Sequence, residues 1–284
     1  MYQAGLVLEG GGMKGFYTAG VLDLFLDKGI EFSSVYGVSA GACHMCSYLS
    51  KQRERAKNVC MDYLKTRDYC GVRSLVTTGD LFNAKVCYEL IPDYLDPYDY
   101  EAFNRYQGKA YAVVTNIETG RPEYMRIRDM KKDISAVRAS ASLPLVSRNV
   151  KIGNGLYLDG GLADSVPISK SILDGNRKNV VVLTKEEGFR RKADSAANLA
   201  LIKMRYLKYP KVYELMKNRH VAYNQMLDYL AEQVKAGRAF VIRPSEKSDV
   251  GRIEKDEEKL TRLYEQGYRE AKEQYEQLKS YLDN

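Results

Sequence analysis

The chain has 284 residues, of which 45% are apolar and 29% charged. This composition is typical of globular proteins and excludes the disordered and fibrous classes, and the length permits one large unit with an appendage. The net charge of +7 is too small to indicate a nucleic-acid partner, but it is compatible with contact with an anionic membrane surface.

The first sixty residues predict alternating strands and helices. An apolar run leads into a glycine-rich loop, and a second short run leads into Gly37-Val38-Ser39-Ala40-Gly41. The spacing predicts a strand over 4–9, a helix over 15–28, a strand over 32–36 and a helix over 40–57. Such a unit builds a parallel sheet through right-handed crossovers, so we expect the glycine loop and Ser39 to meet at one sheet edge.

Cysteines are confined to residues 43–87 and are odd in number, which favours reduced thiols. Cys43 and Cys46 form a C-x-x-C that has no second pair at zinc-ligand spacing. We interpret them as buried apolar side chains, with a metal or redox role as the alternative. The sequence therefore predicts neither a metal nor a cofactor.

The middle of the chain predicts a Tyr- and Asp-rich helix and loop over 80–106, which either covers the site or forms a surface connection. Further strands are expected at 109–115, 123–127, 179–184 and 239–242, and residues 150–158 are expected to form a hairpin that turns at Gly153-Asn154-Gly155. The strand that ends near residue 158 leads directly into Asp159. From Ile253 onward a narrow apolar stripe on a charged helix indicates packing against the rest of the protein.

Ser39 is the candidate nucleophile, because Gly-x-Ser-x-Gly between a strand and a helix holds a serine on a sharp turn with its hydroxyl exposed. A serine needs a general base. His44 lies about 140° around the same helix from Ser39, and His220 belongs to a basic helix that we expect at the periphery, so neither is well placed. Asp159, followed by two glycines, is the better candidate, although Asp-Gly-Gly alone is usually only a turn.

The glycine loop at Gly10, Gly11, Gly12, Met13 and Lys14 offers backbone N–H groups at the start of a helix, where an oxyanion or a phosphate can bind. The loop also fits Gly-x-Gly-x-x-Gly. A dinucleotide site would need an acidic residue at the end of the second strand, where Gly37 and Ser39 stand instead. A phosphate-binding P-loop fails because Gly15 follows Lys14.

These three motifs, in this order, resemble those of the patatin-like phospholipases. The resemblance runs from residue 5 to 170 and includes Ala139-Ser140-Ala141-Ser142-Leu143-Pro144. It implies a three-layer α/β/α sandwich with a mainly parallel central sheet and a lipid or phospholipid ester substrate. It further implies an acyl-enzyme at Ser39, Asp159 as proton acceptor, and an oxyanion site at the glycine loop. Lys14 departs from the family's usual arginine, and Ser165 from its frequent asparagine.

We expect a catalytic unit over 1–184 and a helical C-terminal extension over 185–284 that packs on it. The extension resembles that of bacterial patatin-like proteins through Arg219-His220 and the segments 242–245 and 250–252. Residues 185–219 hold ten Lys and Arg against four acids, with Tyr206, Tyr209 and Tyr213 interleaved. We interpret this region either as a surface that meets anionic lipid or as a solvated basic face.

The sequence thus predicts a serine hydrolase of carboxylic esters that uses a Ser39–Asp159 dyad. The alternative is a non-catalytic lipid- or acyl-binding protein on the same scaffold. The absence of a leader pattern and of a long apolar stretch leads us to expect a cytoplasmic protein, peripheral at most to the membrane. Nothing in the sequence indicates the oligomeric state.

Overall fold

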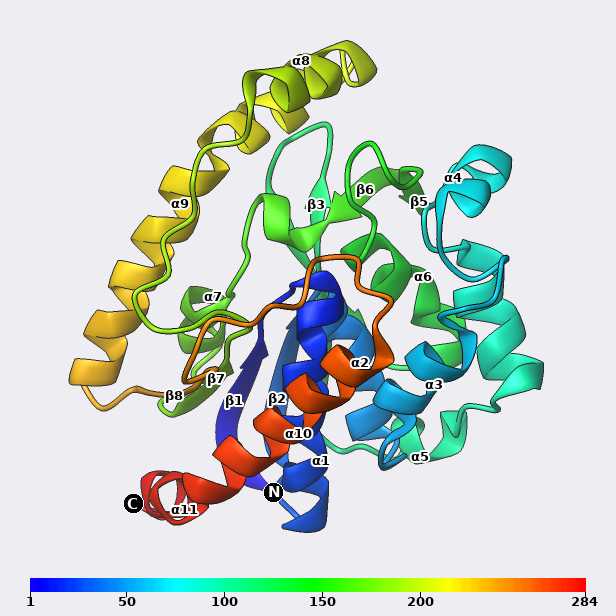
Figure 1. The fold of residues 1–284 in the computed structure, drawn as a ribbon. Helices are drawn as coiled ribbons and strands as arrows, with labels where there is room; N and C mark the ends of the chain where they lie inside the picture. Colours follow the sequence, from blue (N-terminus) through cyan, green and yellow to red (C-terminus); the bar gives the residue numbers. More distant parts are fainter.

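A computed structural model describes all residues 1–284. One mixed sheet runs through it in the strand order β5-β6-β3-β2-β1-β7-β8, with β4 also paired to β3 (Figure 1). The strands are β1 (Tyr2–Leu8), β2 (Phe32–Val38), β3 (Lys109–Asn116), β4 (Pro122–Ile127), β5 (Val150–Ile152), β6 (Gly155–Asp159), β7 (Asn179–Val182) and β8 (Ala239–Ile242). The five strands β3, β2, β1, β7 and β8 are parallel, and β4, β5 and β6 are antiparallel to their neighbours.

Helices surround this sheet. They are α1 (Phe16–Asp27), α2 (Ala40–Leu49), α3 (Arg55–Tyr63), α4 (Val72–Thr78), α5 (Tyr100–Asn104), α6 (Met130–Ser140), α7 (Ile168–Leu173), α8 (Ala196–Arg205), α9 (Pro210–Lys235), α10 (Glu257–Glu273) and α11 (Tyr275–Asp283). Two short 3₁₀ turns, η1 (Gly12–Gly15) and η3 (Gly160–Leu162), and one π-helix, η2 (Val86–Leu95), complete the fold.

The sheet is buried on both faces, as the apolar run of β1 requires. Leu6 and Leu8 pack in the core beneath α1, α2 and α6, whereas Val7 between them packs on the opposite face with α7 and α9. This alternation gives three layers, helix, sheet and helix, and confirms the expected α/β fold (Figure 1).

The C-terminal helix α10 lies along α1 on the outside of the first helical layer (Figure 1). The two backbones approach closely at Gly20 and Gly267, where an added methyl group would lie 2.0 Å from the Tyr264 oxygen and 2.1 Å from the Tyr17 oxygen. The division of the chain after Thr184 stays a prediction. The residues that follow it supply β8, which pairs with β7 in the same sheet.

Two helices differ from the sequence-based expectation. The helix predicted over 40–57 ends at Leu49, because Lys51 and Glu54 adopt positive φ angles of 60° and 62° and α3 begins only at Arg55. The long C-terminal helix is divided at Gln274 into α10 and α11. Both differences are local turns that apolar periodicity does not reveal.

Candidate active site

Ser39 occupies the turn between β2 and α2, and its backbone has φ 55° and ψ −123°. A non-glycine residue holds such a conformation only where its surroundings fix it. Here the Ser39 amide donates a 2.9 Å hydrogen bond to the Ser140 hydroxyl, and the next turn approaches β1 so closely that a methyl group on Gly41 would lie 2.5 Å from the Leu8 oxygen. The side chain is thereby held at the carboxyl end of the parallel strands.

Asp159 is the last residue of β6 and is only 2% exposed. Its Oδ1 accepts a 2.7 Å hydrogen bond from the Gly161 amide, and its own amide donates to the Ser142 oxygen at 2.7 Å. Burial raises the pKa of this carboxyl above its ordinary value, while the positive charge of Arg219 and the Ser39 hydroxyl act in the opposite direction. Asp159 is therefore a fixed, water-shielded carboxyl close to Ser39.

The Ser39 and Asp159 side chains both line one polar cavity. The structure gives no hydrogen bond of ordinary length between them, although the hydroxyl is close enough to favour the charged carboxylate. Catalytic hydrogen bonds of this kind often tighten only when substrate binds. The strands β2 and β6 thus bring to one cavity the two residues that the sequence analysis paired as a candidate dyad.

The glycine loop follows β1 and runs beside Ser39, where a methyl group on Gly10 would lie 2.6 Å from the Ser39 Cβ. No hydrogen bond uses the amides of Gly10, Gly11 and Gly12. The Met13 amide differs, because it donates to the Arg252 oxygen at 3.1 Å, so in this structure it is not free for an oxyanion. Lys14 lines the same polar cavity.

Neither histidine has the position of a general base. His44 is buried beside the apolar part of the site, and burial lowers its pKa to about 4, which makes it a weak proton acceptor. His220 lies on α9 and lines neither cavity, and its Nδ1 is buried without a hydrogen-bond partner.

Arg219 is one of four cations of this site that the sequence reasoning missed, with Lys185, Arg191 and Arg252. We expected it on a basic surface, but it is 9% exposed, and its Nε donates a 2.8 Å hydrogen bond to the Gly161 oxygen next to Asp159. Tyr206 is likewise buried, and Tyr209 and Tyr213 pack partly against the same apolar cluster, because α8 and α9 close over η3. The basic surface expected over 185–219 therefore lacks these residues.

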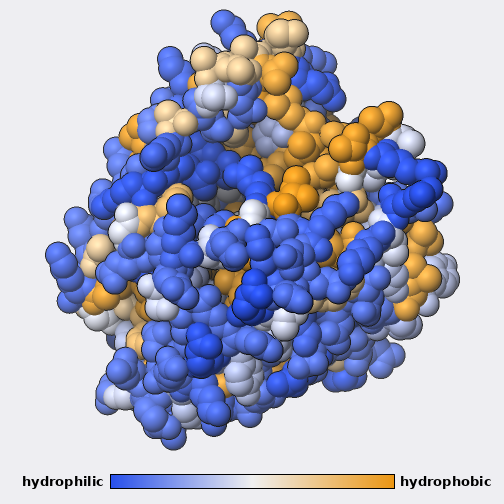
Figure 2. All heavy atoms as spheres, viewed as in Figure 1, coloured by the Kyte–Doolittle hydropathy of each residue, from blue (hydrophilic) through white to orange (hydrophobic).

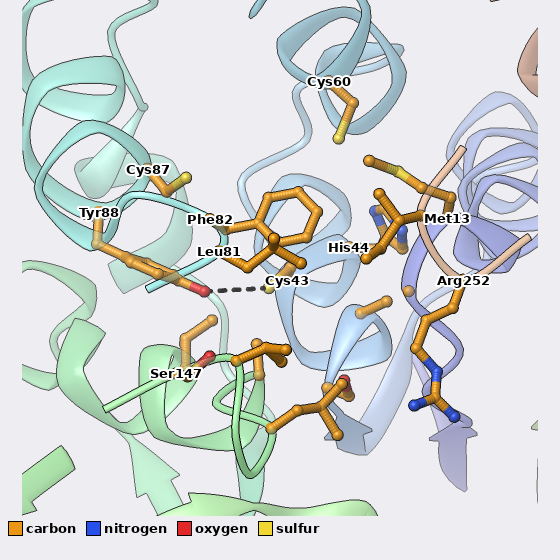
Figure 3. Close-up of a pocket in the computed structure, with 18 of the residues that line it drawn as sticks. Met13, Cys43, His44, Cys60, Leu81, Phe82, Cys87, Tyr88, Ser147 and Arg252 are labelled. Carbon is orange, nitrogen blue, oxygen red and sulfur yellow. Dashed lines mark hydrogen bonds between the residues drawn. The ribbon is translucent and has the colours of Figure 1, made fainter. Parts of the chain in front are cut away.

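An apolar cavity of about 430 Å³ extends from Ser39 between α2, α3, η2 and α6. Figure 3 shows Tyr88 and Cys87 at one end of it and Arg252 at the other, with Cys43 and His44 between them. Seven of the 37 lining residues belong to the segment 80–106, so this segment helps to cover the site. Cys43 and Cys46 are free thiols in this lining, and burial raises the pKa of Cys43 to about 12, so that it remains neutral.

The polar cavity, of about 230 Å³, adjoins the apolar one. It is lined by five cationic side chains, Lys14, Lys185, Arg191, Arg219 and Arg252, and by two carboxylates, Glu9 and Asp159. Ser39 borders both cavities. The site therefore combines an apolar chamber and a positively charged chamber on the two sides of one serine.

A family model described as patatin-like phospholipase matches residues 6–171, which is more than half of the chain. The chain belongs to the patatin-like phospholipase family. This confirms the resemblance carried by the glycine loop, the serine turn and the Asp-Gly-Gly turn. A second model, described as a domain of unknown function (DUF6363), matches residues 209–283.

Two curated relatives each match part of the chain. The chain is 29% identical over 184 residues to the uncharacterized protein YjjU of Escherichia coli (strain K12), which covers 63% of this chain and 51% of that protein. It is 24% identical over 193 residues to the probable lipid hydrolase 463L of Invertebrate iridescent virus 6, which covers 63% of this chain and 66% of that protein. The chain thus spans between half and two thirds of these relatives.

Among solved structures, VipD from Legionella pneumophila aligns with a TM-score of 0.51 at 14% sequence identity. The alignment covers 96% of this chain and 66% of VipD. At this identity the likeness shows the fold alone, a patatin-like sheet with surrounding helices and a helical C-terminal region.

Proposed function

We propose that this protein hydrolyses carboxylic esters of lipids, with Ser39 as nucleophile and Asp159 as general base. Family membership supports a lipid acyl hydrolase in general terms. The observation that carries the finer proposal is the position of Ser39, which borders an apolar chamber on one side and a polar chamber with Asp159 and the glycine loop on the other. An ester of a fatty acid has the same division into an apolar acyl chain and a polar alcohol.

In the proposed reaction the Ser39 Oγ attacks the carbonyl carbon while its proton passes to the Asp159 carboxylate. The carbonyl oxygen becomes an oxyanion that the free amides of Gly10, Gly11 and Gly12 stabilise. Asp159 then gives the proton to the departing alcohol as the C–O bond breaks, which leaves an acyl group on Ser39. A water molecule repeats the sequence, with Asp159 as base, and releases the fatty acid.

A fluorophosphonate probe tests this proposal against the alternative of a non-catalytic lipid-binding protein. An activated Ser39 is expected to be labelled, and Ser39→Ala is expected to remove the label. Other serines near the site, such as Ser140 and Ser142, serve as internal controls in the same peptide map. Absence of labelling at Ser39 in folded protein would favour the binding protein.

Arg219 is expected to influence how kcat/KM for ester hydrolysis depends on pH. Asp159 must be ionised to accept the proton, and the positive charge of Arg219 counteracts the burial that raises its pKa. Removal of that charge in Arg219→Gln raises the pKa further, so the acid limb of the kcat/KM profile is expected to move to higher pH by about one unit or more. Arg219→Lys keeps the charge and is expected to leave the limb nearly in place. A limb that stays or moves to lower pH in Arg219→Gln would contradict this role.

We also propose that α8 brings the protein to a lipid surface. Figure 2 shows apolar surface over α8 and around the hollow below it. Met204 of α8 and Leu207, two residues after its end, are 69% and 75% exposed, whereas Asn198 and Ile202 of α8 line the apolar cavity. Lys203, Arg205 and Lys208 stand among these exposed apolar side chains. No helix of the protein has both the length and the apolar character that a bilayer span requires.

Met204→Glu combined with Leu207→Glu is expected to weaken binding to anionic phospholipid vesicles at least tenfold, because two side chains lose their burial in lipid. Vesicle co-sedimentation measures the effect. Leu173→Glu is the matched control, since Leu173 is also exposed, at 82%, but lies at the end of α7. Equal binding by all three proteins would refute a membrane role for α8.

A further inference from the structure

We infer, on the basis of the proposed function, that the polar cavity with its five cations, hereafter the cationic cavity, binds a phosphate group on the alcohol side of the ester. The preferred substrates are then acyl esters whose head group is a phosphate monoester, in preference to zwitterionic or neutral head groups. Four of its five cations lie beyond residue 184, so the head-group site is formed mainly by the C-terminal part of the chain.

The cations of this cavity form no ion pair with an acidic side chain. None of Lys14, Lys185, Arg191, Arg219 and Arg252 takes part in an ion pair anywhere in the protein. Their hydrogen bonds go to neutral oxygens instead, from Lys14 Nζ to the Ser248 oxygen at 3.5 Å and from Lys185 Nζ to the Thr184 hydroxyl at 3.0 Å. The Nε of Arg191 is buried with no partner.

The two carboxylates of the cavity compensate for only part of this positive charge. Glu9 accepts hydrogen bonds from the Tyr223 hydroxyl at 2.6 Å and from the Thr184 amide at 2.6 Å, which hold it at the wall. Asp159 is held by the Gly161 amide. Five cations against two carboxylates leave an excess of three positive charges in a chamber of about 230 Å³.

This crowding of like charge disfavours the protonated forms. Burial, together with the neighbouring charges of Arg191 and Arg252, lowers the pKa of Arg219 to about 10, although Asp159 and Asp194 act in the opposite direction. Burial also lowers the pKa of Lys185, with Lys14, Arg191 and Arg252 acting in the same direction. A bound dianion would relieve this repulsion, and such sites are typical of anion binding.

The chemistry of these side chains favours phosphate. Guanidinium groups donate paired N–H bonds that fit phosphate oxygens, and three of the five cations are arginines. A phosphate monoester carries close to two negative charges at neutral pH and removes most of the positive excess. A zwitterionic head group brings its own ammonium and leaves the net excess unchanged.

The location of the cavity assigns the phosphate to the leaving group. Ser39, Arg219 and Arg252 border both chambers, so a phosphate in the cationic chamber and an acyl chain in the apolar chamber meet at the serine hydroxyl. Arg252 is fixed there by its backbone, because its oxygen accepts the Met13 amide of the glycine loop at 3.1 Å.

The first test compares kcat/KM for three soluble monoacyl substrates with one acyl chain: a monoacylglycerol, a lysophosphatidylcholine and a lysophosphatidic acid. The lysophosphatidic acid is expected to be preferred at least tenfold over both others. Lys185→Gln with Arg191→Gln is expected to reduce this preference about tenfold or more, because charge-assisted hydrogen bonds are lost. Lys217→Gln with Lys235→Gln removes two exposed charges of α9 and should leave the preference unchanged.

Absence of a preference in the wild-type protein, or an equal loss on all three substrates in the cavity variant, would overturn the inference. A fall in the melting temperature identifies a variant that has lost its fold, and Arg191→Lys, which keeps the charge, then replaces it. This conservative variant is expected to retain part of the preference.

The second test measures binding without turnover, by calorimetry on Ser39→Ala with glycerol 3-phosphate, glycerophosphocholine and inorganic phosphate. Glycerol 3-phosphate is expected to bind, and to bind more tightly than glycerophosphocholine. If inorganic phosphate binds but lysophosphatidic acid is not the preferred substrate, the cavity is not a head-group site and the inference is overturned. Binding of glycerol 3-phosphate by a protein that hydrolyses no ester would support the anion site and overturn the proposed function. Ester hydrolysis by a protein that does not bind glycerol 3-phosphate would support the proposed function and overturn the anion site.

Discussion

Ser39→Ala and Asp159→Asn are each expected to lower kcat for hydrolysis of a nitrophenyl ester by about a thousandfold or more. Ser39→Ala removes the only hydroxyl that borders both chambers beside the glycine loop. Asp159→Asn leaves an oxygen that can still accept the Gly161 amide, but an amide side chain cannot take the proton of the serine. The two changes act on one proton transfer, so the double variant is expected to be no slower than either single variant.

The control for these two variants is a measurement that each has kept its fold. Circular dichroism and thermal melting are expected to show native secondary structure in both, because Ser39 and Asp159 are held by backbone contacts that the substitutions keep. Ser165→Ala is a matched serine variant in the wall of the polar cavity, and its hydroxyl donates only to the Gly161 oxygen at 2.9 Å. Full activity in folded Asp159→Asn would exclude a dyad mechanism.

Removal of residues 243–284 is expected to abolish cooperative folding of the remaining chain. The helix α10 covers α1, whose residues are mostly buried in the assembled protein. Two hydrogen bonds join the helices in the interior, from the Tyr17 hydroxyl to Glu270 at 2.8 Å and from the Tyr264 hydroxyl to Asp23 at 2.7 Å. A truncated chain exposes the apolar face of α1 and leaves Asp23 without its tyrosine partner.

A point variant tests the same contact in the full chain. Gly267→Val forces a side chain to within 2.1 Å of the Tyr17 oxygen, and the free energy of unfolding is expected to fall by about 3 kcal/mol or more. Gly251→Ala is the control, because its added methyl group would meet no atom closer than 3.5 Å. Chemical denaturation measures both. A truncated chain that unfolds cooperatively, or a Gly267→Val protein as stable as the control, would show that α10 is dispensable.

The sequence was sufficient for the strands and for the turns that carry Ser39 and Asp159, because each depends on a local pattern, whereas the catalytic role of the two residues stays a prediction. Apolar runs mark the buried strands, and glycines beside Ser39 and Asp159 mark the turns that expose them. Chain order and handedness also place the glycine loop beside Ser39, but they do not place Asp159, whose strand β6 is antiparallel to β3. The turn after Leu49 escaped prediction because nothing in the apolar spacing marks it.

The cationic cavity could not be predicted in the same way, since its members come from segments far apart in the sequence. One signal was nevertheless present. Val212, Met216 and Tyr223 are buried on one face of α9, and Arg219 falls on that face, three residues after Met216 and four before Tyr223. A cation within an apolar stripe has to find a buried partner, and here the partners are the Gly161 oxygen and the charge of Asp159.

The hydrogen bond between Met13 and Arg252 joins the glycine loop to a residue 239 positions later in the chain. During synthesis the nucleophile, the loop and the aspartate leave the ribosome long before Arg219 and Arg252 do. The proposed centre is therefore complete only after residue 252 has been synthesised, and a chain that stops before this residue lacks both Arg252 and its contact with the glycine loop.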